Sequence, residues 1–224
     1  MRGIEVLFLG NNMLRLLEGL WVTVRLALVS IGLSLILGSA LGAAMTLKNR
    51  AVKIITRVYL EIIRIMPQLV FLFIVFFGVT KLTGANLSGE TSAVIVFTLW
   101  GTAEVGDLVR SAFGAIPKHQ FESGMSLGLS KPQLYLFVIF PQALRGLVPN
   151  IINLSMRMIM TTALVSLIGV TEVLKVGKQI IDANRFDYPN AAIWVYAAIF
   201  LLYFLICFPL SLISRRLAKR GADK

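Results

Sequence analysis

Long apolar blocks alternate with short polar segments along the whole chain. A bilayer core about 30 Å thick needs roughly 20 apolar helical residues to cross it. Because no water is present there, backbone N–H and C=O groups must bond within a helix or a closed barrel. Runs of this length predict an all-α, polytopic membrane protein with five transmembrane helices. The predicted spans cover residues 20–47, 62–79, 91–108, 147–170 and 191–213.

The polar segments between the blocks define the predicted organisation. The longest connection, residues 110–146, joins the third and fourth spans, and a short basic stretch follows the last span. We expect residues 1–215 to form a single transmembrane domain and residues 216–224 to form a basic tail.

Composition supports a membrane class and changes how the charge is interpreted. The 224 residues are 57% hydrophobic and 15% charged, with mean hydropathy +0.82, whereas soluble proteins carry about 25% charged residues. The net charge of +11 raises the question of nucleic-acid binding. The cations form no single basic face but fall between the apolar blocks, so we expect no nucleic-acid partner.

The first block has one alternative interpretation, a cleaved signal peptide, because the residues from Ser39 to Ala44 are small. A signal core is only about 7–15 residues long and follows basic residues. This block is far longer and precedes its basic residues, which favours a span.

Charge asymmetry between the spans predicts the orientation, since Lys and Arg are retained on the cytoplasmic side. Residues 48–64 contain five basic residues against Glu61 alone, and the C-terminal tail is similarly basic. Residues 1–18, 80–90 and 171–190 each carry as many acids as bases. The N-terminus is therefore predicted outside, with the 110–146 loop and the C-terminus in the cytoplasm.

The 110–146 loop has the local signals of two short helices. Pro117 suits a first helical turn and Gly128 a helix end. Ser130, followed by Lys131 and Pro132, suits the start of a second helix directed toward Pro141. Small residues on the first helix allow close approach of another backbone, and two apolar residues form a knob. A rigid, partly apolar pair of this kind suits docking in a groove of another protein, although an ordinary loop packed on its own bundle is the alternative. The predicted docking residues are Pro117, Phe121, Glu122, Ser123, Gly124, Met125 and Gly128.

This loop resembles the "EAA" coupling loop of ATP-binding-cassette (ABC) importer permeases, most closely in the polar-amino-acid branch with histidine, glutamine, glutamate or arginine as cargo. Ser123 and Gly124 replace the two alanines of the pattern, and His119 replaces a glycine, so we interpret His119 as incidental. The matching residues are Arg110, Ile116, Pro117, Gln120, Glu122, Leu127, Gly128, Pro141, Gln142, Ala143, Leu144 and Arg145. Further matches are Tyr59, Glu61, Arg64, Pro67, Asn153, Thr162, Leu164, Ile168, Gly169, Val170 and Glu172.

The resemblance implies an assembly in a bacterial plasma membrane. Two permeases, identical or paralogous, lie side by side, with a dimer of cytoplasmic ATPases below and an extracytoplasmic amino-acid-binding protein above. The chain lacks the Gly-x-x-x-x-Gly-Lys-Ser/Thr loop that cradles nucleotide phosphates. We therefore expect a non-catalytic subunit without a cofactor of its own, with ATP bound by its partners.

Charges inside the predicted spans are costly, roughly 2.5–3.5 kcal/mol each, and mark either function or pairing. Arg25 lies near a membrane surface and can extend to the headgroups. Asp107, where the family has a glutamate, lies one turn from Arg110, which favours an i,i+3 pair. Glu104 stands where the family generally has a tyrosine.

Arg157 lies midway along the fourth span, on one helical face with Asn153 and Thr161. A guanidinium can hold a carboxylate through two parallel hydrogen bonds, so the carboxylate of an amino acid is a candidate partner. A structural pair with Glu104 is the equal alternative. The chain also lacks a Lys and a Ser that the family has after this position. Candidate cargo residues are Glu104, Asn153, Arg157, Thr161 and Thr162.

The sequence thus predicts the permease of an ATP-driven importer for a polar amino acid. The alternatives are a permease of the same fold for an opine or osmolyte, a self-contained secondary carrier or channel, and an intramembrane enzyme. A carrier has no use for a docking helix pair, and no paired nucleophile and base supports an enzyme. Cys207 is the only cysteine and His119 the only histidine, so we expect no disulfide within the chain and no metal site.

Overall fold

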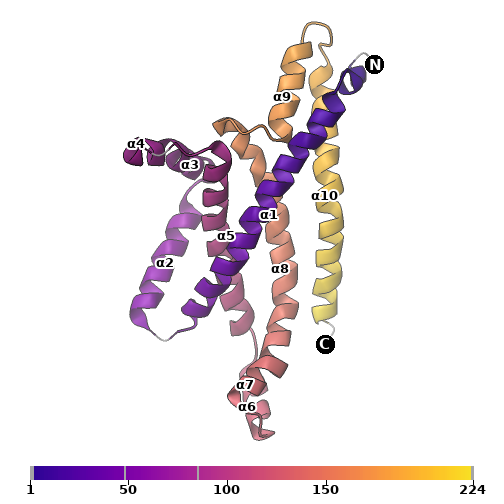
Figure 1. The fold of residues 1–224 in the computed structure, drawn as a ribbon. Helices are drawn as coiled ribbons and strands as arrows, with labels where there is room; N and C mark the ends of the chain where they lie inside the picture. Colours follow the sequence, from indigo (N-terminus) through magenta and orange to yellow (C-terminus); the bar gives the residue numbers. More distant parts are fainter. Residues whose placement is uncertain (1–2, 48, 85, 223–224) are drawn as a thin grey trace. The chain divides into compact units, whose positions relative to one another are not determined.

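Helices make up nearly all of the structure, a computed structural model that describes residues 3–47, 49–84 and 86–222 (Figure 1). No strand occurs in these residues, and the all-α prediction is confirmed. The long helices are α1 (Asn12–Met45), α5 (Gly89–Gly114), α8 (Phe140–Thr161) and α10 (Ala191–Ala222). The shorter elements are η1 (Ile4–Phe8), α2 (Arg50–Ile65), α3 (Gln68–Phe73), η2 (Ile74–Val79), α4 (Thr80–Thr83), α6 (Lys118–Ser126), α7 (Lys131–Leu134), η3 (Tyr135–Ile139), η4 (Thr162–Ile168) and α9 (Val173–Asn184).

Within the described residues, four helical runs are long and apolar enough to cross a membrane by themselves. They are Asn12–Met45, Gly89–Gly114, Lys131–Ile168 and Ala191–Lys219. The predicted second span is instead interrupted between α2 and α3, where Pro67 adopts an extended conformation with ψ of 127°. A proline disfavours helical backbone at the residue before it, which accounts for the break. The pair Arg50–Ile65 and Gln68–Thr83 provides a fifth span if the two helices count as one.

The chain divides into two compact units. Unit 1 comprises residues 1–31, 66–97 and 156–209, and unit 2 comprises residues 32–65, 98–155 and 210–224. The four long helices each contribute residues to both units. At the C-terminus, α10 continues through residue 215 to Ala222, so the first residues of the predicted tail are helical.

Unit 1 has an apolar core that joins the start of α1 to α9 and α10. Gly19 of α1 makes the close approach to α9 possible, because a Cβ there would lie 2.9 Å from the Val173 backbone. The Arg15 guanidinium donates a 2.8 Å hydrogen bond to the Gln179 side chain. The α1 helix consequently begins at Asn12, eight residues before the predicted span. The buried core residues are Val6, Leu7, Leu16, Val173, Val176, Ile180, Ala191, Val195 and Ile199.

Glu172 is a fully buried acid at the start of α9 in unit 1. Its carboxylate accepts the backbone N–H groups of Leu174 and Lys175 at 2.9 and 2.8 Å, which is the usual geometry of a helix N-cap. Burial raises the pKa of Glu172, and the two hydrogen bonds act in the opposite direction. The family-like glutamate therefore has a local structural role in starting α9.

Unit 2 is held together by a close crossing of α1 and α5. Cβ atoms added at Gly38 and Gly42 would lie 2.5 and 2.6 Å from the Cβ atoms of Val105 and Val109. Such small-xxx-small spacing lets membrane helices pack backbone to backbone. Gly42, one of the small residues that suggested a cleavage site, thus belongs to a helix interface. Tyr59 attaches α2 to the same helix by donating a 2.6 Å hydrogen bond to the Leu99 carbonyl.

Contacts inside unit 2 show which helix ends lie on the same face of the membrane. Met45 at the end of α1 and Phe113 at the end of α5 line one cleft. Ser111 of α5, Gln142 of α8 and Ser214 of α10 line another. Because α1 and α5 end on the same face, the residues between them must cross the membrane once. We infer that the interrupted α2–α3 pair makes that crossing, which gives the five spans that the sequence predicts.

Candidate functional site

Both helices of the pair between α5 and α8 begin where the sequence predicts, and the first helix also ends there. Pro117 precedes α6 in an extended conformation, and Gly128 follows it with φ of +80°, a left-handed value that suits glycine. The backbone N–H of Gly128 donates to the Met125 carbonyl at 2.9 Å. Ser130 then precedes α7, and the Gln133 side chain accepts its backbone N–H at 2.9 Å. Local sequence signals were sufficient to predict these boundaries.

The second helix of the pair does not end near Pro141 as predicted. Instead α7, η3 and α8 form one helical run from Lys131, so the helix that contains the predicted fourth span begins sixteen residues before that span. The π-turn η3 places the N–H of Phe140 on the Tyr135 carbonyl, five residues back. A π-turn at this point accommodates the missing N–H and the ring of Pro141 without ending the helix.

Residues of α6 that were predicted to face a partner are partly used inside the chain. Gly124 is buried, and a Cβ there would collide with the Leu134 side chain of α7. The Phe121 ring packs edge-on against Tyr135 with centroids 6.0 Å apart. Both contacts attach α6 to the helical run that leads into α8, because Leu134 and Tyr135 belong to that run. Gly124 and Phe121 therefore have contacts within the chain, and the docking role predicted for them stays a prediction.

The outer face of the pair carries other residues of the same set. Glu122 and Ser123 are exposed, and Met125 is 51% exposed. Leu127, just after α6, is 82% exposed. These four exposed residues are accessible to a partner.

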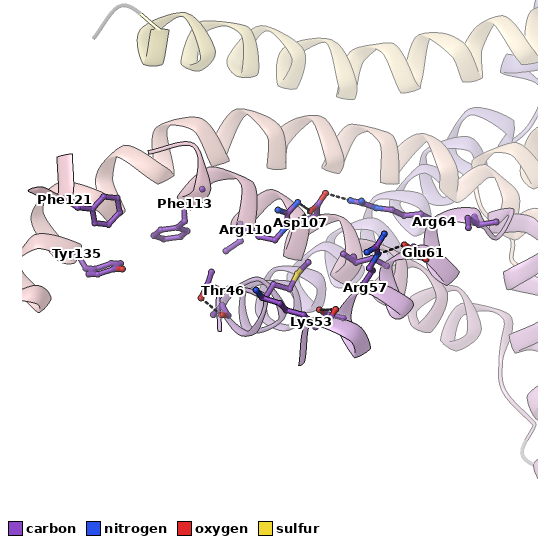
Figure 2. A pocket seen from close by; sticks show the side chains of 17 residues that line it. Thr46, Lys53, Arg57, Glu61, Arg64, Asp107, Arg110, Phe113, Phe121 and Tyr135 are labelled. Atoms are coloured by element: carbon purple, nitrogen blue, oxygen red, sulfur yellow. Dashed lines mark hydrogen bonds and ion pairs between the residues drawn. The ribbon is translucent and has the colours of Figure 1, made fainter. Parts of the chain in front are cut away.

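A cleft of about 1030 Å³ lies in unit 2 between α2, α5 and the helix pair (Figure 2). One wall carries a cluster of ion pairs. The Arg64 guanidinium of α2 bonds to Glu104 at 3.2 Å and to Asp107 at 2.8 Å, both on α5. Asp107 also accepts a 3.0 Å hydrogen bond from Arg110, so the predicted i,i+3 pair is confirmed. The cluster joins α2 to α5 through charges that the membrane would otherwise penalise.

Arg64 is an ion-pair partner of Glu104 and Asp107 that charge spacing did not find. It lies 40 residues from Glu104 and 43 from Asp107, and no local pattern links such positions. The only sequence signal was the presence of opposite charges in two neighbouring apolar blocks. Glu104 thus has Arg64 as an observed partner, and its predicted pair with Arg157 stays an alternative.

The candidate cargo residues fall into both units. Asn153 borders a second cleft of about 1100 Å³ in unit 2, where its side-chain oxygen accepts a 3.0 Å hydrogen bond from Ser214. This cleft also has Gln142, Asn150 and Arg145 in its lining, and no acidic side chain among the described residues that border it. A polar, cationic cleft of this size suits a small solute that carries a carboxylate.

Arg157, Thr161 and Thr162 belong to unit 1. Arg157 is exposed, and its carbonyl accepts a 2.7 Å hydrogen bond from the Thr161 hydroxyl. Thr162 is fully buried, and its hydroxyl donates to the Ile159 carbonyl at 2.7 Å. The two threonine hydroxyls thus satisfy helix carbonyls, which leaves the Arg157 guanidinium as the chemically distinctive group of the three.

Arg25 also has a partner. Its guanidinium forms an ion pair with Glu90 of α5 within unit 1, beside a small groove of about 280 Å³. Within the part of the chain that the structure describes, no group of three His, Cys, Asp or Glu side chains could hold a metal ion.

Comparison with known proteins places these features in a family. Residues 31–222 match the model of the binding-protein-dependent transport system inner membrane component. The probable glutamine ABC transporter permease protein GlnP of Bacillus subtilis (strain 168) is 32% identical over 207 residues, covering 91% of this chain and 92% of that protein. The L-cystine transport system permease protein TcyB of the same organism is 32% identical over 202 residues, covering 90% and 84%.

Solved structures show the same fold. A crystal structure of an amino acid ABC transporter with histidines superposes with a TM-score of 0.83 at 24% identity, covering 93% of this chain and 94% of that chain. The MetNI methionine ABC transporter in an inward-facing conformation gives a TM-score of 0.71 at 18% identity, covering 93% and 97%.

Proposed function

Since the chain belongs to the family of binding-protein-dependent transport system inner membrane components, we propose that it is the permease through which an ATP-driven importer moves a polar amino acid into a bacterial cell. The chain is a multi-pass protein of the inner membrane and a non-catalytic subunit of its transport complex. Relatives named for glutamine and cystine support an amino-acid cargo. A same-fold permease for an opine or osmolyte is the alternative.

The observation that carries the proposed mechanism is the continuity of α7, η3 and α8. A displacement of the helix pair would be transmitted to α8 directly, because no flexible loop separates them. The same helix carries Asn153 and Arg157, two of the cargo candidates. Cytoplasmic ATPases that dimerise on ATP binding would thereby move the cargo path. The partners in this scheme are an ATPase dimer, a second permease and an extracytoplasmic amino-acid-binding protein.

We further propose that the N-terminus lies outside and the helix pair inside. Cysteines introduced as Gly84→Cys and Asn184→Cys, in a Cys207→Ser background, should react with a membrane-impermeant thiol reagent in intact cells. Lys118→Cys should react only after the membrane is opened, because basic segments are retained in the cytoplasm. Labelling in the opposite pattern would reverse the orientation and remove the docking role of the helix pair.

The cargo proposal is that Arg157 receives the α-carboxylate. In proteoliposomes that contain the chain, its ATPase and its binding protein, Arg157→Gln should lower amino-acid uptake roughly 30-fold or more. Arg157→Lys should also transport poorly, because an ammonium cannot form the two parallel bonds. The melting temperature of both variants should stay near that of the unmodified chain.

A second variant distinguishes cargo binding from architecture. If the only role of Arg157 is a structural pair with Glu104, which also bonds to Arg64, adding Glu104→Gln to Arg157→Gln restores both folding and uptake. If Arg157 binds cargo, the double change stays inactive. Full uptake by the double variant would refute the cargo role of Arg157 and leave the importer proposal intact.

A further inference from the structure

The cleft in Figure 2 carries more positive charge than its ion pairs neutralise. Its lining includes four cations, Lys53, Arg57, Arg64 and Arg110, against two carboxylates, Glu61 and Asp107, which leaves a net charge of +2. Arg64 and Arg110 are engaged with Asp107 on α5. Glu104, which bonds to Arg64 beside the cleft, brings the acids to three against the four cations, so the surplus cation is Lys53 on α2. Arg57, one turn from Lys53, is paired only with the exposed Glu61.

These two cations are available to a ligand. Among the residues that the structure describes, no carboxylate lies within ion-pair distance of Lys53. Arg57 bonds to Glu61 one turn away at 2.9 Å, but the two side chains are 81% and 58% exposed. An exposed i,i+4 pair contributes little stability, so a stronger anion can displace Glu61 from Arg57. Lys53 and Arg57, also one turn apart, can hold one anionic group between them.

The rest of the cleft is apolar. Phe113 of α5, Phe121 of α6 and Tyr135 of η3 present aromatic rings to it, and Leu60 and Val109 add aliphatic surface. Figure 2 shows the Phe121 and Tyr135 rings together at one end, with Arg57 and Glu61 toward the other. A ligand that matches this cleft has a negatively charged head and an apolar body.

The position of the cleft narrows the class of ligand. Met45 and Thr46 at the end of α1 and Gly114 at the end of α5 border it, so it lies at the level where spans leave the membrane. The side of α2 that carries Ile54, Ile55 and Ile62 is exposed and apolar, which suits contact with acyl chains. Basic pockets between membrane helices at headgroup level are typical sites for anionic lipid headgroups.

We propose that this cleft binds an anionic phospholipid, with Lys53 and Arg57 holding the phosphate and the exposed isoleucine side of α2 contacting an acyl chain. The headgroup then lies between α2 and α5, beside their ion-pair cluster. The site does not depend on which amino acid is carried or on the orientation of the chain.

Native mass spectrometry of the full chain in an uncharged detergent tests the site. Dioleoyl phosphatidylglycerol should be retained in preference to dioleoyl phosphatidylcholine. The double variant Lys53→Ala, Arg57→Ala should lower phosphatidylglycerol affinity about 30-fold, because two headgroup-level cations are lost. The matched control is Arg215→Ala, Lys219→Ala, which removes two exposed cations at the same spacing on α10 in unit 2. The control should keep the affinity of the unmodified chain.

Three outcomes would overturn the proposal. Equal loss in both double variants would mean that the lipid responds only to total charge. Glycerol phosphate that binds as tightly as the lipid would assign the cleft to a soluble phosphate. Loss of the lipid when the ATPase subunit is bound would make the cleft a protein interface.

Discussion

Arg64→Gln should lower the melting temperature of the purified chain by roughly 5–10 °C. The change leaves Glu104 and Asp107 on α5 without the guanidinium that now bonds to both at 3.2 and 2.8 Å. Removing one partner of a buried ion pair costs about 3–5 kcal/mol. Arg64 is 38% exposed, so we expect a loss of about 2–3 kcal/mol, slightly below that range. Thermal unfolding in detergent measures the change.

Arg57→Gln is the matched control on the same helix. Its pair with Glu61 is exposed and spans one turn of α2, so its loss should cost less than about 1 kcal/mol. Adding Glu104→Gln to Arg64→Gln should recover part of the stability, because Asp107 keeps its bond to Arg110. Equal shifts for Arg57→Gln and Arg64→Gln would mean that the cluster does not hold α2 to α5.

Met125→Asp should lower ATP-driven uptake about 30-fold while leaving the melting temperature unchanged. Met125 is 51% exposed on the outer face of α6, where burial of a carboxylate against a partner is unfavourable. Gly124→Leu should behave differently, because its side chain would collide with Leu134 inside the chain. Overpacking of this kind costs about 1–3 kcal/mol, so stability and uptake should fall together.

His119→Gln is the control for the same helix, since His119 is exposed and its side chain contacts only the neighbouring Gln120 in the described hydrogen bonds. Uptake and stability should both be unchanged. Co-purification of the ATPase completes the measurement. If Met125→Asp retains the ATPase and full uptake, the outer face of α6 is not the docking surface, whatever the behaviour of Gly124→Leu.

The sequence by itself determined the features that depend on near neighbours. Apolar blocks of spanning length predicted the class and the five crossings, because the bilayer imposes a length on every helix. Pro117, Gly128 and Ser130 predicted the limits of the short helices, since caps and turns are set by backbone geometry within a few residues. The Asp107–Arg110 pair was equally predictable, one helical turn apart.

Only the tertiary structure decided which distant groups meet. Arg64 bonds to two acids that lie 40 and 43 positions along the chain. Gly124 faces Leu134 of its own chain, although its small size is equally compatible with an external partner. The helix passes through Pro141 because a π-turn precedes it, and positions 38 and 42 are glycine because α5 lies against them. Spacing along a helix specifies a face, but the neighbour on that face is specified by packing between segments that the sequence separates.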